Sequence, residues 1–594
     1  MGWLDKNQRI VGLLYFLYTF VLLQFIFQAN QVSLLRTLVN YLIILPVLGL
    51  LLILTRSYQV AFGILSGLLY AAYWLDGMIY NSRLTHIRYS DLFAVSDASR
   101  VADRYSLTFS GKDAFVLAVV VAVNLLLIFV SRRSNKAKNK KEVGLVGAGV
   151  LAVSLALLIS GTVWQWIPNP MVDSFDTNTS FDRAGLYYSL YGQLRNSRVT
   201  PPEGYSAEQA ERILSRYEGQ EEEIEPVRVI VIMNESLADY SLVGETSFTD
   251  PLKNIHDPEN GYFEGTLAVS VIGGNTCNTE FEFLTGCSLQ FLPVGCLPFP
   301  QLLTSDLPSL AREMKDLGMS ADGIHPYYSQ EWNRRQVYRF LGFDRLIAGE
   351  DFSVGLMNAD EIENVTAHQL NERFLDFGSD LEYIRGFISD AECYRKVTEV
   401  LEEQSENAFV FAVTMQNHGG YEYSGADFTN TEFIPEEPAL NQYLTCTAIS
   451  DASFQALIEQ LAKDREKTIV LMFGDHQPGL DFSNYVKVFA EKSDNDVWRY
   501  DVPYIVWSNF PLEAELPAVT SPNYLSALLK ECAGLPLTAW DRLRLEVVQR
   551  YPVLNANYVM DENYCILNKE EWEGSEQLTE YETVQYYRLF TEKR

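Results

Sequence analysis

Residues 227–233 have the sequence Val-Arg-Val-Ile-Val-Ile-Met, a run of β-branched and apolar side chains. Such a run predicts a strand that is buried on both faces of a parallel sheet. Two later stretches, 408–414 and 468–473, have the same character, and helical stretches at 309–317 and 448–463 lie between or beside them. Alternating strands and helices predict a doubly wound α/β domain, whose ligands bind at the carboxyl ends of the strands.

Polar side chains follow these strands at their carboxyl ends. Glu235 comes shortly after the first strand, and Asp475 and His476 follow the third. Mixed carboxylate and imidazole groups suit manganese, zinc or magnesium, so the three residues are candidate ligands of a divalent cation. Taken singly, a solvated glutamate and a structural histidine remain the ordinary alternatives. The chain has only six histidines, and two of them, His418 and His476, closely follow apolar strands.

A glycine-rich turn, Gly273-Gly274-Asn275, precedes Thr276. A hydroxyl group in such a turn can approach a metal ion closely, and threonine needs that activation to act as a nucleophile. We therefore expect Thr276 to be a metal-activated nucleophile. The local sequence alone also fits an ordinary turn, so this expectation depends on the metal ligands around it.

Five apolar segments precede the α/β domain, and each is close to the roughly 20 residues that a helix needs to cross a bilayer core. Because backbone groups in lipid must be satisfied internally, we expect an α-helical membrane domain with five transmembrane helices, at 10–28, 37–55, 59–80, 114–130 and 143–166.

Six basic residues lie between Arg132 and Lys141, in the short connection before the fifth segment. Such a cluster predicts a cytoplasmic loop. This orientation places the N-terminus in the cytoplasm and everything after Trp166 on the outer side of a cell membrane, in a multi-pass protein.

The chain has 594 residues, more than one ordinary domain. We expect a transmembrane domain at 1–167, a linker with helices at 168–226, a catalytic domain at 227–550 and a C-terminal tail at 551–594 that packs on the catalytic domain. In the linker, the capping box that begins at Ser206 predicts a helix through about residue 217.

The net charge of −31 arises in the part after Trp166, since the residues up to Trp166 contain more basic than acidic side chains. This acidity argues against nucleic-acid binding, in which basic patches supply the affinity. None of the seven cysteines belongs to a C-x-x-C pair, so a zinc-knuckle or thioredoxin-like function has no support. Cys287 and Cys296 are close enough in sequence for an extracellular disulfide, which sequence alone does not decide.

Several short motifs together resemble the lipoteichoic acid synthase family, phosphoglycerol transferases of the alkaline phosphatase and sulfatase superfamily. They occur in the family's order over most of the outer domain, after five apolar segments as in that family. The motifs are Asn234-Glu235-Ser236, Gly274-Asn275-Thr276 with Asn278-Thr279-Glu280-Phe281-Glu282, Trp332-Asn333-Arg334, Asn417-His418-Gly419, Gly474-Asp475-His476-Gln477-Pro478 and the tail Tyr581-Glu582-Thr583-Val584-Gln585-Tyr586-Tyr587.

The resemblance implies an alkaline-phosphatase/sulfatase-like α/β fold and a role for each matched residue. It makes Thr276 the nucleophile and also a ligand of the catalytic metal, typically manganese, together with Glu235, Asp475 and His476. It implies that a second set of residues holds the phosphate and the glycerol or leaving group, namely Arg334 and His418, with His325 and Trp332 lining the same pocket. Tyr327 departs from the family, whose members tend to carry a polar acidic residue there, and this puts the acceptor in doubt.

The resemblance also orders the alternatives. Sulfatases need a C/S-x-P-x-R motif for formylglycine, and Cys277-Asn278-Thr279-Glu280-Phe281 is not that motif, so sulfate ester hydrolysis is disfavoured. Lipid phosphoethanolamine transferases share the five-helix plan and a threonine nucleophile, but their usual zinc-site pattern lacks Gly-Asp-His-Gln-Pro, which makes them the second choice. A phosphodiester hydrolase and a non-catalytic lipid sensor are the remaining alternatives.

The expected activity is transfer of glycerol phosphate from phosphatidylglycerol in two steps. Thr276 attacks the phosphorus, diacylglycerol leaves with His418 as the acid, and an acceptor hydroxyl then displaces Thr276. The acceptor can be a glycerol-phosphate polymer, a glycolipid or a glucan, and the sequence does not choose among them. Nor does it choose between a Gram-positive surface and a periplasm.

Overall fold

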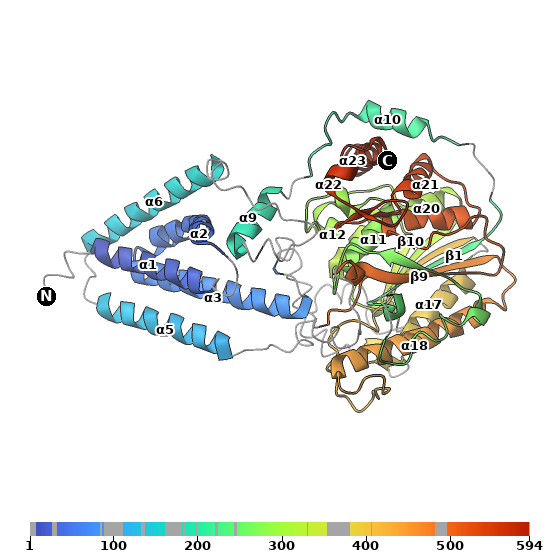
Figure 1. The fold of residues 1–594 in the computed structure, drawn as a ribbon, viewed down its shortest axis with the longest axis horizontal. Helices are drawn as coiled ribbons and strands as arrows, with labels where there is room; N and C mark the ends of the chain where they lie inside the picture. Colours follow the sequence, from blue (N-terminus) through green and yellow to red (C-terminus); the bar gives the residue numbers. More distant parts are fainter. Residues whose placement is uncertain are drawn as a thin grey trace. The chain divides into compact units, whose positions relative to one another are not determined.

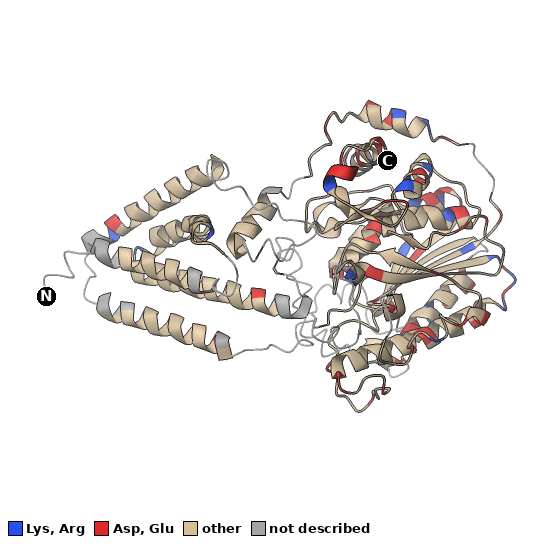
Figure 2. Cartoon of the chain, viewed as in Figure 1, with Lys and Arg blue, Asp and Glu red and all other residues tan. Residues whose placement is uncertain are grey.

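The computed structural model has two compact units, Met1–Leu92 with Ser106–Arg198, and Phe93–Tyr105 with Val199–Arg594 (Figure 1). Figure 2 shows few charged residues on the long helices of the first unit and many on the second. The structure describes residues 8–26, 32–83, 86–87, 111–131, 137–160, 181, 184–196, 199–219, 224–242, 246–329, 331–352, 381–404, 407–480 and 496–592.

The described part of the first unit is helical, and each of the five predicted apolar segments contains a helix. Among the residues that the structure describes, three stretches are long and apolar enough to cross a membrane, Leu34–Thr55, Tyr58–Met78 and Lys140–Ile159, and the apolar stretches found in the other two helices are shorter. The helices described in this unit are α1 (Gln8–Ile26), α2 (Leu34–Thr55), α3 (Tyr58–Arg83), α5 (Gly111–Ser131), α6 (Ala137–Ile159) and α9 (Leu186–Asn196).

Glycines allow α2 and α6 to pack closely. A Cβ atom on Gly49 would lie 2.7 Å from the backbone nitrogen of Leu151, and one on Gly147 would lie 2.8 Å from the Gly49 carbonyl oxygen. Such close backbone contact through small residues is typical of helices that associate in membranes. The basic cluster predicted as a loop lies partly in α6, because Lys138, Lys140 and Lys141 follow Ala137 in a sequence of good helix formers.

An eight-stranded mixed sheet forms the centre of the second unit, in the order β10-β2-β9-β8-β1-β7-β3-β4. β9 runs antiparallel to both of its neighbours, and the other described pairs are parallel. The strands are β1 (Arg228–Asn234), β2 (Phe263–Ala268), β3 (Ser320–His325), β4 (Arg345–Ala348), β7 (Ala408–Val413), β8 (Thr468–Gly474), β9 (Asp501–Ser508) and β10 (Val519–Thr520).

The register brings three predicted strands to a common edge. Met233 of β1 pairs with Val413 of β7 on one side and with Phe473 of β8 on the other. The residues that follow these strands, including Glu235 and Asp475, therefore emerge side by side at the carboxyl ends of the central strands.

Alternating residues of β1 pack into two cores, because successive side chains of a strand point to opposite faces. Val229, Val231 and Met233 belong to one core, and Ile230 and Ile232 belong to the other. The helices that accompany the sheet are α11 (Thr276–Thr285), α12 (Pro298–Gln301), α13 (Leu310–Asp316), α14 (Arg334–Phe340), α17 (Asp390–Glu403), α18 (Pro438–Leu461) and α20 (Pro522–Cys532).

The predicted helix at 309–317 is α13, and the one at 448–463 is the C-terminal half of the longer α18. The linker helix is α10 (Ala207–Ser215), whose N-cap Ser206 accepts a hydrogen bond from the Gln209 backbone, as its capping pattern predicts. Cys287 and Cys296 are both buried free thiols.

The C-terminal residues pack around the helix that carries Thr276. The buried Tyr581 hydroxyl donates to the carbonyl oxygen of Gly286, the residue that caps α11. The elements of this region are α21 (Ala539–Arg550), α22 (Lys569–Trp572), α23 (Glu576–Phe590) and a small sheet of β11 (Val553–Leu554), β12 (Val559–Met560) and β13 (Ile566–Leu567).

Candidate active site

Thr276 is the first residue of α11, after a tight turn. Gly273 has φ 63°, and a Cβ atom there would lie 2.9 Å from the Cα atom of Gly479, so a larger residue does not fit. Asn275, the N-cap, also has a left-handed conformation, with φ 64°. The turn places the Thr276 hydroxyl at a helix N-terminus, where the backbone N–H groups and the helix dipole favour an anion such as phosphate.

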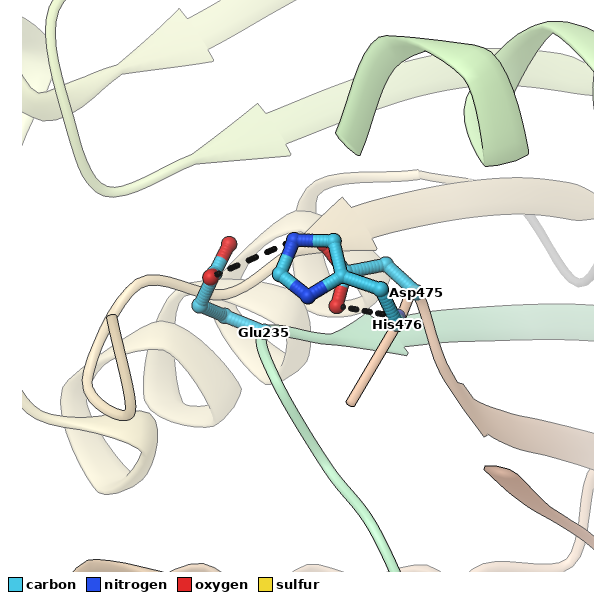
Figure 3. Close-up of side chains that lie close together, drawn as sticks. All are labelled: Glu235, Asp475 and His476. Carbon is cyan, nitrogen blue, oxygen red and sulfur yellow. Dashed lines mark hydrogen bonds and ion pairs between the residues drawn. The ribbon is translucent and has the colours of Figure 1, made fainter. Parts of the chain in front are cut away.

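Glu235, Asp475 and His476 gather at the carboxyl ends of β1 and β8 (Figure 3). One ligand atom from each lies within 4.8 Å of the others, and all three side chains are buried. The Thr276 Oγ1 atom is 3.4 Å from Glu235 Oε2 and 3.5 Å from His476 Nε2. The structure thus brings together the four residues for which the sequence predicts metal binding and nucleophilic attack.

The hydrogen bonds of this cluster fit a divalent cation. His476 Nδ1 lies 2.9 Å from the Gln477 carbonyl oxygen and donates to it, which leaves Nε2 facing the two carboxylates. Asp475 Oδ2 is 3.1 Å from Nε2 but is buried without a hydrogen-bond donor. Burial, and then the nearby Asp475, raise the pKa of Glu235 well above its usual value. Two buried carboxylates beside an imidazole nitrogen form a ligand set that suits a divalent cation.

Arg334 forms a second buried group with residues from two other elements. Its Nε and Nη2 atoms donate to the Glu280 carboxylate at 3.1 Å and 2.7 Å, and Nη1 lies 2.9 Å from His325 Nε2. Three of the five guanidinium N–H groups are therefore occupied, and two are not used by these contacts. The sequence predicted Arg334 as a phosphate ligand but did not predict its ion pair with Glu280. Glu280 lies one helical turn after Thr276 on α11, so it links the two groups.

The remaining predicted residues lie around this second group. His325 is buried, and its Nδ1 atom lies 3.0 Å from the Val413 carbonyl oxygen. Burial, and then the Arg334 cation, lower the pKa of His325 well below its usual value, so it is neutral. Trp332, with φ 52°, packs at the margin of one core. His418 is half-buried in the loop after β7, with its ring 5.6 Å from that of Phe387.

Comparison with protein families shows that residues 228–535, more than half of the chain, match the family described as Sulfatase. The chain belongs to the sulfatase family. The match begins at β1 and contains every residue of the Thr276 and Arg334 groups, so the sulfatase fold positions the whole candidate site.

Relatives of this sulfatase-family chain are diverse. A Rhizobium meliloti protein assigned to cyclic β-1,2-glucan modification is 28% identical over 76% of this chain and 69% of its own length. The lipoteichoic acid synthase of Staphylococcus saprophyticus is 21% identical over 34% of this chain and 28% of its own length. The solved structure of the Streptococcus pyogenes phosphoglycerol transferase GacH with sn-glycerol-1-phosphate covers 66% of this chain and 95% of its own, with 21% identity and a TM-score of 0.50. The comparison with GacH shows that the two proteins share a fold.

Ser236 organises two of the candidate ligands of this sulfatase-family protein, and the sequence assigned it no role. Its backbone N–H donates to Asp475 Oδ1 at 2.7 Å, and its hydroxyl donates to Glu235 Oε1 at 2.8 Å. The residue has φ 53°, and the Tyr443 hydroxyl donates to its carbonyl oxygen at 2.7 Å. The position of Ser236, directly after a candidate metal ligand at a strand end, was the only sequence feature that could have indicated this role. Its left-handed backbone could not be predicted, because it depends on the hydrogen bond from Tyr443.

Replacing Ser236 with alanine removes the hydrogen bond to Glu235 and keeps the backbone bond to Asp475. We expect metal affinity to fall by about 10–100-fold, the range for groups that orient metal ligands, while the fold is retained. Titration of the metal-free domain with Mn²⁺ by calorimetry measures this. Ser453→Ala on α18, which removes only a local helix bond to the Ile449 carbonyl oxygen, is the control. Equal affinity in Ser236→Ala and wild type would contradict the role.

Proposed function

We propose that this protein is a membrane-anchored phosphoglycerol transferase of the lipoteichoic acid synthesis type. It moves glycerol phosphate from phosphatidylglycerol to an extracytoplasmic acceptor through a covalent intermediate on Thr276. One observation carries the proposal: the buried hydroxyl of Thr276, at a helix N-terminus, lies within 3.5 Å of both Glu235 and His476. A nucleophile, a cation site and an anion-binding helix end are the parts that phosphoryl transfer requires.

The membrane unit fits a lipid donor that never leaves the bilayer. In the proposed topology all five long helices, α1, α2, α3, α5 and α6, span the cell membrane, with the N-terminus in the cytoplasm and the sulfatase domain outside. Large apolar side chains on these helices are exposed, including Leu54 at 69%, Phe129 at 74% and Ile159 at 81%, as lipid-facing positions require.

In the first step, Thr276 Oγ1, which has lost its proton to solvent, bonds to the phosphorus of phosphatidylglycerol. The bond from phosphorus to the diacylglycerol oxygen breaks, and that oxygen keeps the electron pair and takes a proton from His418. Glu235, Thr276, Asp475 and His476 would hold a divalent cation, with Mn²⁺ expected and Mg²⁺ or Zn²⁺ as alternatives, which when bound would lower the pKa of the threonine hydroxyl and offset phosphate charge.

In the second step, an acceptor hydroxyl oxygen bonds to the phosphorus and the bond to Thr276 breaks. His418, now neutral, takes the acceptor's proton, which restores the enzyme. The two N–H groups of Arg334 that Glu280 and His325 do not use donate to phosphate oxygens, and Trp332 and His325 line the glycerol pocket. Because the Glu280 carboxylate neutralises the charge of Arg334, the Arg334 guanidinium orients the phosphate by hydrogen bonds and contributes little electrostatic attraction.

The acceptor is a hydroxyl of a glycerol-phosphate polymer, a glycolipid or a glucan. The relative assigned to glucan modification supports a glucan, and the lipoteichoic acid synthases support a glycerol-phosphate polymer. Tyr327 is buried, with its ring 6.2 Å from that of His325 and 6.2 Å from that of Phe387. An aromatic residue here, where the synthases tend to carry a polar acidic residue, puts the choice of a glycerol-phosphate polymer as acceptor in doubt.

The donor is tested by incubating the purified full-length protein in vesicles with phosphatidylglycerol, phosphatidylethanolamine or both, with radiolabel in the diacylglycerol part. We expect labelled diacylglycerol from phosphatidylglycerol alone, with glycerol phosphate transferred to an added polyol or glucan. Release from phosphatidylethanolamine alone would contradict the proposal and favour phosphoethanolamine transfer. Release of free glycerol phosphate at the same rate with and without acceptor would favour hydrolysis.

A further inference from the structure

A short hairpin, β5 (Tyr383–Ile384) and β6 (Phe387–Ile388), has an unusual residue at its tip. Ile384 pairs with Phe387, so the loop consists of Arg385 and Gly386, with φ 53° and 76°. Two consecutive positive φ values define a tight turn that favours asparagine or aspartate followed by glycine. An arginine in the first position is strained, and such strain persists only where surrounding contacts compensate for it.

The Arg385 side chain makes the compensating contacts. It is 3% exposed, although the tip of a hairpin is normally solvated. Nη2 donates to the carbonyl oxygens of Gln416 at 3.1 Å and His418 at 2.8 Å, and Nη1 donates to that of Gly420 at 3.1 Å. Within the part of the chain that the structure describes, no carboxylate forms an ion pair with this guanidinium. Its hydrogen bonds go instead to the loop that carries His418.

The same hairpin also contacts the His418 ring. Phe387, two residues after Arg385, has its ring 5.6 Å from the imidazole at an interplanar angle of 51°. The Arg385 guanidinium lies 5.0 Å from the centre of the ring of Tyr421, three residues after His418 in the same loop. One hairpin therefore constrains the His418 backbone through Arg385 and its side chain through Phe387.

The opposite side of this loop is fixed to the central sheet. Asn417 Nδ2 donates to Asn234 Oδ1 at 3.1 Å and to Ser450 Oγ at 2.9 Å. Asn234 directly precedes the metal-ligand candidate Glu235. With Asn417 anchored to β1 and α18, the carbonyl contacts of Arg385 set how the next residue, His418, is presented to the site.

We propose that Arg385 is a positioning residue for His418, and that the hairpin 383–388 holds this histidine at the distance and angle that proton transfer to the leaving oxygen needs. The inference rests on the proposed role of His418 in phosphoglycerol transfer. A planar guanidinium that donates to three carbonyl groups of one loop fixes that loop more firmly than a lysine ammonium can, because the fork has a rigid geometry.

The test is a double-mutant cycle with Arg385→Met and His418→Ala, measured as diacylglycerol release from phosphatidylglycerol. Diacylglycerol release by Arg385→Met should be about 100-fold slower than by wild type, which is the effect expected when a catalytic group is misplaced by ~1 Å. If Arg385 acts through His418, the double variant is no slower than His418→Ala. Arg395→Met, an exposed arginine on α17, is the control and should match wild type.

A second substrate separates positioning from general damage to the site. A phosphodiester with a nitrophenol leaving group needs no proton from an acid, so first-turnover nitrophenol release by Arg385→Met should stay within about threefold of wild type. The proposal would be overturned if Arg385→Met slowed the reactions of phosphatidylglycerol and of the nitrophenol phosphodiester equally. It would also be overturned if the rate losses of Arg385→Met and His418→Ala were additive in the double variant. If Arg385→Met does not fold, Arg385→Lys is used in the same cycle. Wild-type protein that releases no diacylglycerol would instead refute the proposed function, which makes the two failures distinguishable.

Discussion

Replacing Thr276 with alanine is expected to reduce diacylglycerol release by roughly 10³–10⁶-fold, the range for removing a catalytic nucleophile. In the proposed mechanism the hydroxyl oxygen bonds to phosphorus, and its neighbours within 3.5 Å, Glu235 and His476, are assigned to the cation and do not replace it. The measurement is turnover of labelled phosphatidylglycerol by the full-length protein in vesicles.

Two variants control this result. Thr276→Ser keeps a hydroxyl and should retain a measurable part of the activity. Thr398→Ala, on α17, removes a hydroxyl that bonds only the Arg395 carbonyl oxygen and should behave as wild type. Similar melting temperatures of all three proteins show that the fold is intact. Full activity of Thr276→Ala would refute the assignment of the nucleophile.

Removal of the divalent cation is expected to have a comparably large effect. Without it, the Glu235 and Asp475 carboxylates face each other in a buried site, and the threonine hydroxyl has no activating charge. Dialysis against a chelator should abolish turnover, and Mn²⁺ should restore it. Binding also stabilises the folded state, by about 2.7 kcal/mol when the metal is at 100 times its Kd. The melting temperature is therefore a second measurement, independent of activity.

Asp475→Asn should lose both the Mn²⁺-dependent increase in melting temperature and the activity. Asp451→Asn is a matched control, because Asp451 is equally buried but accepts hydrogen bonds from Asn254 and Ile255 away from the cluster. It should keep its response to Mn²⁺ even if it is less stable. A melting temperature of wild-type protein that no divalent cation changes would contradict the metal site.

Sequence reasoning works best where one local pattern determines the outcome. The β-branched runs predict β1, β7 and β8, and parallel pairing then requires Glu235, Asp475 and His476 to share one edge of the sheet. The glycine-rich turn before Thr276 is also a local feature, because Gly273 has φ 63°, a conformation that glycine adopts without strain. The alternation of β1 between two cores also follows from its composition.

Contacts between distant segments were not predictable. Glu280 and Arg334 are 54 residues apart, and nothing in either local sequence indicates that they pair. The antiparallel β9 and β2 extend the sheet beyond the alternating pattern. The left-handed conformations of Ser236 and Arg385 are imposed by tertiary hydrogen bonds, since neither residue type favours positive φ.

The covalent intermediate on Thr276 is the central claim, and mass spectrometry of the protein after incubation with phosphatidylglycerol tests it most directly. Rapid acid quenching without acceptor, followed by peptide mapping, locates any adduct. We expect a glycerophosphate group on the peptide that contains Thr276, present in wild type and absent from Thr276→Ala. An unmodified Thr276 during active turnover, or an adduct on another residue, would contradict it.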